Sequence, residues 1–482
     1  GDATLTSSKR DVGENAPEDR IADLVSACLP DTPGEDPPAW GNVEDRLREM
    51  VPDTTFEQPP LRTFSAPSST IAEEDWRFVP AEEEGALKQI EMGGTPVQQY
   101  SNGKKLAKNG VQTGRNPVFL VDDDSIEEYG IEDELVKPLV AGENIFRWCS
   151  ETPENPKLLY TTPDTELDSY PGAKEYLLDH KEDTGDQKGL ASRYCVTDGV
   201  REWYELAEYR PDTFGQPLIF TPDVSYYSNF WYDNSGEVYG LNSVYVLYLI
   251  DQMDPYYQVG LLNSNVVQFF IRRIASSYGS DYLRYQWDYM KKVPLPDPTD
   301  APAELVAGIT DAAEELSELR REYVDARRFR EDPTELLDEF ETKSLSYAGY
   351  IDRLGFQELD GELHPTRDGQ TVRFGVTGAQ IEFTDEQAAK IVSELLQALD
   401  VTTADELRGL ELPPLKNGLV ALFDRYEEAG TVVANAPETA ETLEREYNEL
   451  VYDLYELDEE TRTLIDDRVA RPENPLEPRE IE

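Results

Sequence analysis

An excess of acidic side chains constrains this chain more than any other feature of its sequence. The 482 residues include 99 Asp and Glu against 44 Lys and Arg, a formal net charge of −55, and only 15 of the basic residues are Lys. Such a charge opposes compaction through self-repulsion unless salt screens it. Hydrophobic residues still make up 39% of the chain, which is enough for a sizeable core. We therefore expect a globular protein of a halophilic kind, which folds in molar salt.

Several classes of protein are excluded early. No apolar run reaches the roughly 18 residues of a membrane-spanning helix, and the N-terminus carries neither an initiator Met nor a signal pattern, which suggests a fragment or a processed chain. The three Cys residues stand far apart and form no Cys-x-x-Cys pair. This spacing argues against a disulfide framework or a zinc ribbon and favours a reducing compartment. We expect a cytoplasmic protein without a membrane partner.

Changes in composition and residue pattern along the chain predict three parts. Residues 1–74 are rich in Pro, Asp and Glu and resemble a linker or tail. In residues 75–298, short β-type runs with aromatic residues alternate with Gly, Asn, Asp and Pro turns. Residues 299–482 show mainly helical patterns, with a small mixed α/β patch near residues 350–400. The fold class expected is α+β, a twisted and β-rich domain followed by long acidic helices.

Individual elements can be placed within these parts. Strands are expected at Pro117–Val121, Lys157–Tyr160, Pro217–Phe220, Glu237–Tyr239 and Val244–Ile250. Helices are expected at Ile21–Cys28, Val43–Met50, Ala173–Asp179, Val266–Ile274, Pro302–Arg328, Thr384–Ala398 and Thr439–Leu457. The last of these carries an apolar stripe of Leu443, Tyr447, Leu450, Val451 and Leu454, as a spacer or dimer helix would.

Motifs that carry catalysis are missing or weak. The chain contains no Gly-x-Gly and no P-loop, and the run Asp36–Ala39 has Ala where an adenine methyltransferase places an aromatic ring. The set Asp164, Asp179 and Lys181 fits a metal-dependent nuclease only loosely, and 99 acidic residues make such matches common. The two His residues lie beside no nucleophile pattern. We expect no catalytic residue and no metal site here, with the nuclease kept as a minor alternative.

A binding surface is the remaining possibility. Residues 100–292 hold 18 basic and 31 acidic residues, so this region is about half as acidic per residue as the rest of the chain. A lower acid excess favours contact with a polyanion. The alternative explanation is that a larger core leaves less surface to carry charge.

Polar and basic residues gather at three places in this region. The first is a Gly-framed loop, in which Gln, Thr, Arg and Asn side chains could bond to base edges or phosphates, although a plain surface hairpin would carry the same residues. The other two lie around Arg193 and just before a Pro-rich segment at Val293–Pro296. The candidate DNA-binding residues are Lys104, Lys105, Gln112, Thr113, Gly114, Arg115, Asn116, Arg193, Trp203, Tyr204, Lys291 and Lys292.

The segment Gly110–Phe119 resembles a Gly-Ile/Val-x-Thr-Gly-x-Asn-x-x-Phe loop. This loop opens the TaqI-like specificity domain, the target-recognition region of adenine-specific DNA methyltransferases, type IIG restriction–modification enzymes and related phage-defence methyltransferases. Further segments resemble later blocks of that family in the same order: Leu135–Leu139, Tyr170–Arg193, Arg201–Glu205, Gln216–Phe220, Leu261–Ser264 and Tyr289–Pro296. The run Leu443–Leu457 is similar to the helix that closes such methyltransferases.

The resemblance implies the recognition portion of a larger enzyme. Family members that methylate carry a Gly-rich cofactor motif and a Pro-Pro-aromatic loop, and this chain has neither. No cofactor is therefore expected in this chain, and S-adenosylmethionine would belong to a missing methyltransferase domain or subunit. Double-stranded DNA is the expected partner, with the loop Gln112–Asn116 near base edges or backbone.

The phosphate contacts implied are Lys104, Lys105, Arg193, Lys291 and Lys292. The alternative function is a helical scaffold or protein-partner subunit without DNA contacts.

Overall fold

The structure is a computed structural model, and it divides the chain into two compact units. Unit 1 comprises residues 1–317, 443–473 and 478–482, and unit 2 comprises residues 318–442 and 474–477. The residues described are 3–8, 56–58, 61–66, 80–101, 105–185, 188–275, 277–278, 282–331, 343–344, 351–355, 364–375, 379–399, 401, 403–414, 418–469 and 474–476. The three-part division at residues 74 and 298 stays a prediction.

Unit 1 begins with a small antiparallel sheet in the order β1-β3-β2. Its strands are β1 (Ala3–Ser8), β2 (Phe56–Gln58) and β3 (Leu61–Ala66). The next elements are α3 (Ala81–Gly93), β4 (Thr95–Pro96) and α4 (Val97–Tyr100). The strand β4 pairs with β17 (Pro294–Leu295), which brings the two ends of the β-rich region together.

A four-stranded antiparallel sheet, in the order β12-β10-β14-β5, lies at the centre of unit 1. Its strands are β5 (Ala107–Asn109), β10 (Leu218–Pro222), β12 (Trp231–Asp233) and β14 (Val244–Leu247). Every residue of β10 and β14 is buried, which explains their unbroken apolar sequences. Phe220 of β10 pairs with Val246 of β14 in the register of this sheet.

Helices α9 (Pro255–Asn263) and α10 (Asn265–Ile274) build the main core of unit 1. Ser264 caps α10, because its hydroxyl accepts a hydrogen bond from the backbone N–H of Val267 at 3.2 Å. The C-terminal stripe packs into the same core, where Tyr447 and Val451 are fully buried. These two residues belong to α15 (Val420–Leu454), which is followed by α16 (Glu459–Arg468).

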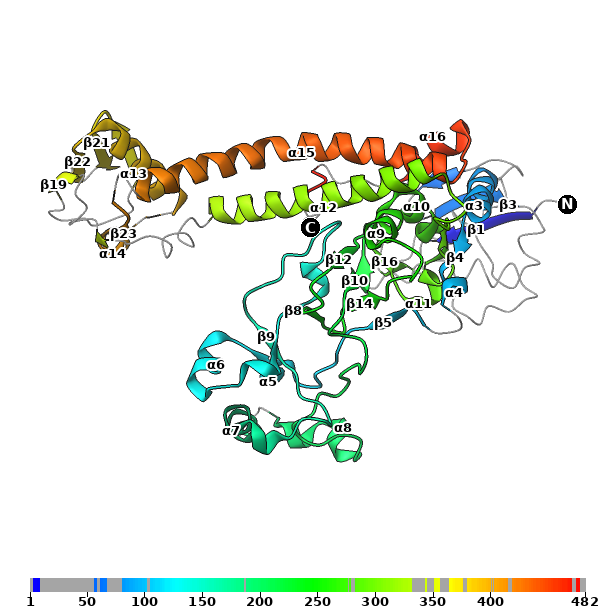
Figure 1. The fold of residues 1–482 in the computed structure, drawn as a ribbon, viewed down its shortest axis with the longest axis horizontal. Helices are drawn as coiled ribbons and strands as arrows, with labels where there is room; N and C mark the ends of the chain where they lie inside the picture. Colours follow the sequence, from blue (N-terminus) through cyan, green and yellow to red (C-terminus); the bar gives the residue numbers. More distant parts are fainter. Residues whose placement is uncertain are drawn as a thin grey trace, which may run out of the picture. The chain divides into compact units, whose positions relative to one another are not determined.

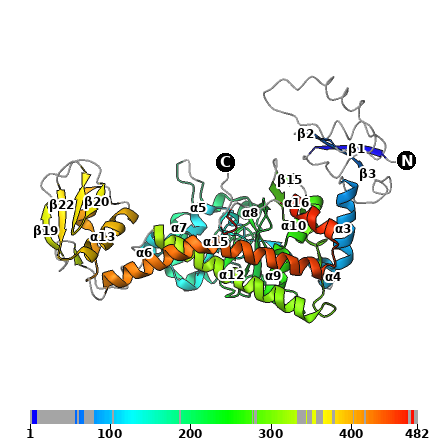
Figure 2. The same ribbon diagram turned by 90° about the horizontal axis from the view of Figure 1, so that it is seen from above.

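A second core includes Val111 of the Gly-framed loop. The ribbon of this region is drawn in Figures 1 and 2. Its helical elements are α5 (Asn116–Phe119), α6 (Asp123–Tyr129), η1 (Asp133–Leu135), η2 (Gly142–Asn144), η3 (Leu167–Ser169), α7 (Pro171–Asp179), η4 (Leu190–Ser192) and α8 (Tyr194–Thr197). Its strands are β6 (Leu120–Val121), β7 (Val136–Lys137), β8 (Leu139–Val140), β9 (Lys157–Leu159) and β13 (Tyr239–Gly240). The remaining elements of the β-rich region are β11 (Val224–Ser225), β15 (Ser277–Tyr278), β16 (Tyr282–Arg284) and α11 (Trp287–Met290).

Unit 2 contains a four-stranded antiparallel sheet in the order β19-β22-β21-β20, with α13 packed beside it (Figure 2). The strands are β19 (Ile351–Gly355), β20 (Pro365–Asp368), β21 (Thr371–Phe374) and β22 (Ala379–Phe383). The other elements are β18 (Lys343–Ser344), α13 (Glu386–Ala398), α14 (Ala404–Gly409) and β23 (Glu411–Leu412). The unit also includes part of α12 (Ala303–Glu331) and part of α15.

The fold class expected from the sequence is confirmed. The structure is mixed α+β with long helices toward the C-terminus, namely α12 and α15. No helix among the described residues has an apolar stretch long enough to cross a membrane. The helices expected at residues 21–28 and 43–50 lie outside the described residues.

Two expected elements differ from the structure. The strand expected at Pro117–Val121 is mostly helix, because Pro117 occupies the first turn of α5 and only β6 is extended. The helix expected at Thr439–Leu457 starts earlier, since α15 begins at Val420 and continues through Pro437. Packing outweighs the cost of this proline, because Ala436 and Ala440 are buried in one cluster with Tyr323 and Val324 of α12.

Candidate nucleic-acid interface

The Gly110 loop, residues 110–116, connects β5 to α5. Backbone hydrogen bonds to other segments hold it in place. Gln112 exchanges two backbone hydrogen bonds with Glu208, each 2.9 Å long. A Cβ atom on Gly110 would lie 2.1 Å from the carbonyl oxygens of Gly240 and Leu241. Only glycine allows this close approach of two backbone segments. The loop is therefore a rigid part of the second core.

Thr113 shapes the tip of the Gly110 loop from inside. Its hydroxyl accepts a hydrogen bond from the backbone N–H of Arg115 at 3.0 Å and donates one to Oδ1 of Asn116 at 2.5 Å. Gly114 adopts a left-handed conformation with a φ of 71°. Because Thr113 is buried and its hydroxyl is used, this side chain defines the turn and offers little to a ligand.

Arg193 is the most buried of the basic candidates, with 3% of its surface exposed. Its guanidinium donates to the carbonyls of Leu190, Thr113, Trp203 and Glu205, at distances between 2.8 and 3.2 Å. Burial lowers the pKa of this guanidinium. These four bonds hold the guanidinium inside the fold, and the phosphate contact expected for Arg193 stays a prediction.

Gln112 and Arg115 differ from Thr113 and Arg193, whose polar groups are bonded within the fold. Within the described part of the chain, neither side chain makes a hydrogen bond or an ion pair, and the Nε of Arg115 is buried without a partner. Gln112 is half-exposed, and Arg115 has unused donors, so both side chains are free to bond to a ligand. These two side chains are the strongest candidates for contacts with base edges.

Two lysines that the sequence did not single out for DNA contact lie near the Gly110 loop. The pKa of the Asp183 carboxyl is lowered, first by a backbone hydrogen bond from Gly189 at 2.7 Å, then by Ser192, and then by Lys188 and Arg115 nearby. The ammonium of Lys181 lies 4.7 Å from the centroid of the Trp203 ring.

Both lysines have acidic neighbours in the sequence, so the sequence did not indicate a basic group there. Only the tertiary structure places Lys188 near Arg115 and Lys181 beside Trp203. The candidate rings Trp203 and Tyr204 meet edge to face, with centroids 5.7 Å apart, and burial raises the pKa of Tyr204.

A second basic group forms where α11 contacts β5. The pKa of the Asp288 carboxyl is lowered, first by a 2.8 Å hydrogen bond from Lys291 and further by Lys105 and Lys292. The structure therefore brings three of the predicted phosphate contacts together around one acid. Lys104, the fourth lysine predicted, lies outside the described residues.

The residues of the minor nuclease alternative have other partners. Asp179 accepts a hydrogen bond from the hydroxyl of Tyr129 at 3.1 Å, and Lys181 lies over Trp203. Among the residues that the structure describes, no group of three Asp, Glu, His or Cys side chains is arranged to hold a metal ion. The structure gives this alternative no support.

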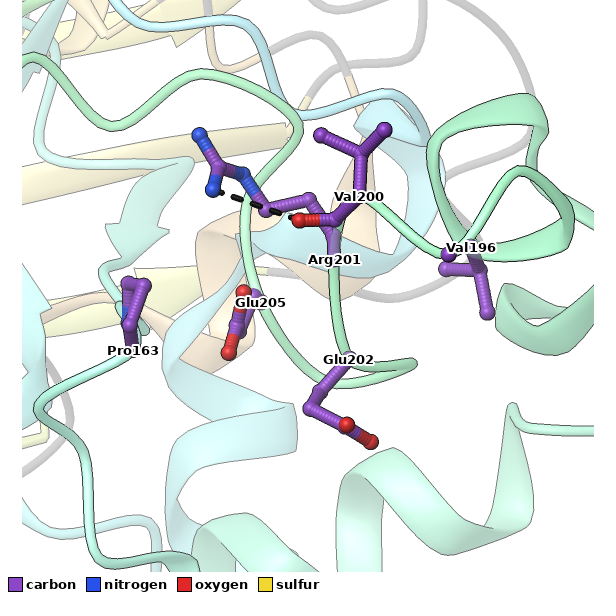
Figure 3. A pocket seen from close by; sticks show the side chains of 7 residues that line it. Pro163, Val196, Val200, Arg201, Glu202 and Glu205 are labelled. Carbon is purple, nitrogen blue, oxygen red and sulfur yellow. Dashed lines mark hydrogen bonds between the residues drawn. The ribbon is translucent and has the colours of Figure 1, made fainter.

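A hollow of about 490 Å³ opens beside the Arg193 network (Figure 3). It is lined by Pro163, Val196, Gly199, Val200, Arg201, Glu202 and Glu205. Glu205 has 5% of its surface exposed, and burial raises the pKa of its carboxyl. The Arg201 guanidinium bonds to the carbonyl of Ala207 at 3.2 Å, which leaves the carboxylates as the main polar groups of this hollow.

Comparisons with known proteins identify the region that carries this interface. Residues 137–295, about a third of the chain, match the family described as the TaqI-like C-terminal specificity domain. The Gly110 loop precedes this range, but Gln112 pairs with Glu208 and Thr113 bonds to Arg193, so the loop is joined to the matched region.

The curated relatives are methyltransferases. The chain is 25% identical over 259 residues to the type II methyltransferase M.BstVI of Geobacillus stearothermophilus, covering 52% of this chain and 43% of the relative. It is 23% identical over 249 residues to the type II methyltransferase M.PaeR7I of Pseudomonas aeruginosa, covering 51% of this chain and 41% of the relative. The chain thus spans less than half the length of these relatives.

Solved structures give weaker likenesses. The type IIG restriction endonuclease BpuSI is similar with a TM-score of 0.36 and 10% identity, covering 57% of this chain and 33% of that chain. The type IIL restriction–modification enzyme MmeI, solved in complex with DNA, is similar with a TM-score of 0.32 and 13% identity, covering 70% of this chain and 37% of that chain. By sequence, residues 137–295 match the TaqI-like C-terminal specificity domain, and the chain is related to type II methyltransferases.

Proposed function

We propose that this chain is the DNA target-recognition portion of an adenine-N6 DNA methyltransferase or a type IIG restriction–modification or phage-defence enzyme. Its specificity domain and its methyltransferase relatives support this function. The observation that carries the proposal is the pair Gln112 and Arg115, two side chains that make no hydrogen bond within the described residues and stand on a loop held by a close backbone approach. Arg contacts guanine and Gln contacts adenine with two hydrogen bonds each. The pair has the chemistry needed to read base edges in the major groove.

Phosphate contacts would come from the two basic groups. Lys188 lies near Asp183 together with Arg115 of the Gly110 loop, Lys181 lies over the Trp203 ring, and Lys105, Lys291 and Lys292 gather at Asp288. In molar salt, the release of counterions adds little to affinity, because binding falls as roughly the 0.9Z power of the salt concentration for Z phosphates. Hydrogen bonds and shape then supply most of the binding, which is compatible with a negative net charge.

The methyl-transfer chemistry would belong to another domain or subunit. S-adenosylmethionine needs a Gly-rich turn, and the chain contains no Gly-x-Gly, so the residues present do not fit that cofactor. A catalytic partner that flips adenine out of the duplex would supply it.

The test is selection of bound duplexes from a randomised pool, followed by fluorescence anisotropy in molar KCl. The full chain is compared with the double variant Gln112→Ala/Arg115→Ala. Because each two-bond contact is worth about 1–3 kcal/mol, we expect the parent to enrich one short motif and the variant to bind it roughly tenfold or more weakly.

A matched control is Gln98→Ala/Arg445→Ala, which removes the same two residue types from exposed positions on α4 and α15. This control should bind like the parent. If the parent enriches no motif in any salt where it stays folded, the scaffold alternative replaces the proposal.

A further inference from the structure

We propose that the hollow beside Arg193 receives the amino-bearing edge of a base, with Glu205 accepting a hydrogen bond from the exocyclic amino group of cytosine or adenine. This inference rests on the proposed function and names the chemistry read at one base pair. It adds a carboxylate that determines specificity to a surface where the sequence predicted only basic, polar and aromatic side chains as DNA contacts. The following observations carry it.

Glu205 is placed in the hollow with unused acceptor capacity. It comes from the same turn as Glu202, as Figure 3 shows, and its carboxylate accepts a hydrogen bond from the backbone N–H of Glu202. An ionised carboxylate can accept about four such bonds. No ion pair involving Glu205 is present among the described residues, since Arg193 and Arg201 bond to carbonyls instead. A ligand with an amino group would use the acceptor sites of this carboxylate that the Glu202 N–H does not occupy.

The surroundings of Glu205 favour a base over a phosphate. Two carboxylates stand against the one guanidinium of Arg201 in the lining, which disfavours a phosphate group, whereas Glu accepts hydrogen bonds from cytosine N4. The opposite wall is apolar, with Val196 and Val200, and can pack against the flat ring or a thymine methyl group.

Exposed apolar side chains also mark this place as a surface that is covered. Large apolar residues that are strongly exposed number four among the described residues, and two of them belong to the segment 194–200, from which Val196, Gly199 and Val200 line the hollow. These are Tyr194, 80% exposed, and Val200, 63% exposed. Apolar side chains gathered at one place on an otherwise acidic surface indicate an interaction site.

The hollow and the Gly110 loop belong to one rigid frame. Nη1 of Arg193 donates to the carbonyl of Thr113 at 2.8 Å, and Nη2 donates to the carbonyl of Glu205 at the same distance. A Cβ on Gly114 would lie 3.1 Å from the Cβ of Ala207, two residues beyond Glu205. One duplex held by Gln112 and Arg115 would therefore present neighbouring base pairs to Glu205.

The experiment repeats the duplex selection with Glu205→Ala and with the control Glu237→Ala, an exposed Glu outside the hollow. Alanine is used because a Gln amide would still accept a hydrogen bond from an amino group. We expect one column of the parent motif to hold cytosine or adenine. Glu205→Ala should relax that column by roughly fivefold or more and leave the other columns unchanged. The control should reproduce the parent motif, and thermal unfolding of each variant checks that it stays folded.

A second measurement identifies the group that is recognised. The base at the affected column is replaced by its analogue without the amino group, 2-pyrimidinone for cytosine or purine for adenine. The parent should lose affinity by roughly the same factor as the Ala variant lost, and the Ala variant should lose little more. If Glu205→Ala is folded and keeps every column and the affinity of the parent, the inference is wrong while the proposed function stands. If the parent selects no motif, both fail.

Discussion

A single guanidinium, that of Arg193, joins three segments of the candidate interface. It donates to the Gly110 loop at Thr113, to the turn at Leu190 and to the turn that contains Trp203 and Glu205. Hydrogen bonds from a charged donor to buried carbonyls are among the stronger ones in proteins. Arg193 therefore positions the segments that carry the proposed DNA contacts.

Replacing Arg193 by Ala should unfold this region more easily. Four carbonyls would lose their donor, and we expect the free energy of unfolding to fall by about 2–4 kcal/mol. The check is thermal or urea unfolding in molar KCl. Arg193→Lys keeps the charge but lacks the planar donors, so it should recover only part of the loss. An unfolding free energy equal to that of the parent in Arg193→Ala would contradict this role.

Residue types alone singled out these polar residues but did not separate those bonded inside the fold from those that are free to contact a ligand. Gln112, Thr113, Arg115 and Arg193 all appeared as possible DNA contacts, because each carries the appropriate polar group. Burial and hydrogen bonds separate them, since Thr113 and Arg193 are used inside the fold and the other two are not. Lys181 and Lys188 were missed for the same reason, because their neighbours depend on tertiary structure.

At the scale of elements, replacing two glycines by alanine is expected to change the stability of the protein in opposite directions. Gly110→Ala would place a Cβ 2.1 Å from two carbonyl oxygens, so β5 and the segment at Gly240 would have to separate. Gly85 lies in α3, exposed, with no atom near its added Cβ. Alanine favours helices over glycine by about 1 kcal/mol, so Gly85→Ala should stabilise the protein by roughly that amount.

Urea unfolding of the two glycine variants provides the measurement. We expect Gly110→Ala to lose about 2 kcal/mol or more and to weaken DNA binding, because the Gly110 loop shifts. Gly85→Ala should bind DNA like the parent. Equal stability of the two variants would show that the close approach at Gly110 is not required.

Local patterns predicted whole elements better than their ends. The apolar runs of β10 and β14 and the stripe with Tyr447 and Val451 led to the observed strands and packing. The start of α15 was missed, because Pro437 argues for a break that burial of Ala436 and Ala440 overrides. The short helix α5 was missed as well, since four residues carry no periodicity.

At the scale of the whole molecule, the charge of −55 predicts a strong dependence on salt. Raising KCl from about 0.5 M to 3 M should raise the melting temperature by many degrees, because screening removes repulsion among the carboxylates. Circular dichroism across this range is the measurement. A melting temperature that does not change with KCl would contradict the halophilic interpretation, while a rise in sodium chloride of equal ionic strength would show that screening is the cause.

The position of Arg193 has a consequence for how such a protein could acquire a new target. The Gly110 loop and the turn bearing Glu205 are held through main-chain carbonyls, which every amino acid possesses. Side chains in both segments can therefore be exchanged without cutting the bonds that hold them in place. The bonds that hold the two segments do not depend on the side chains that would contact DNA. A library that varies Gln112, Arg115 and Glu205 around a fixed Arg193 would therefore test new DNA sites on an unchanged fold.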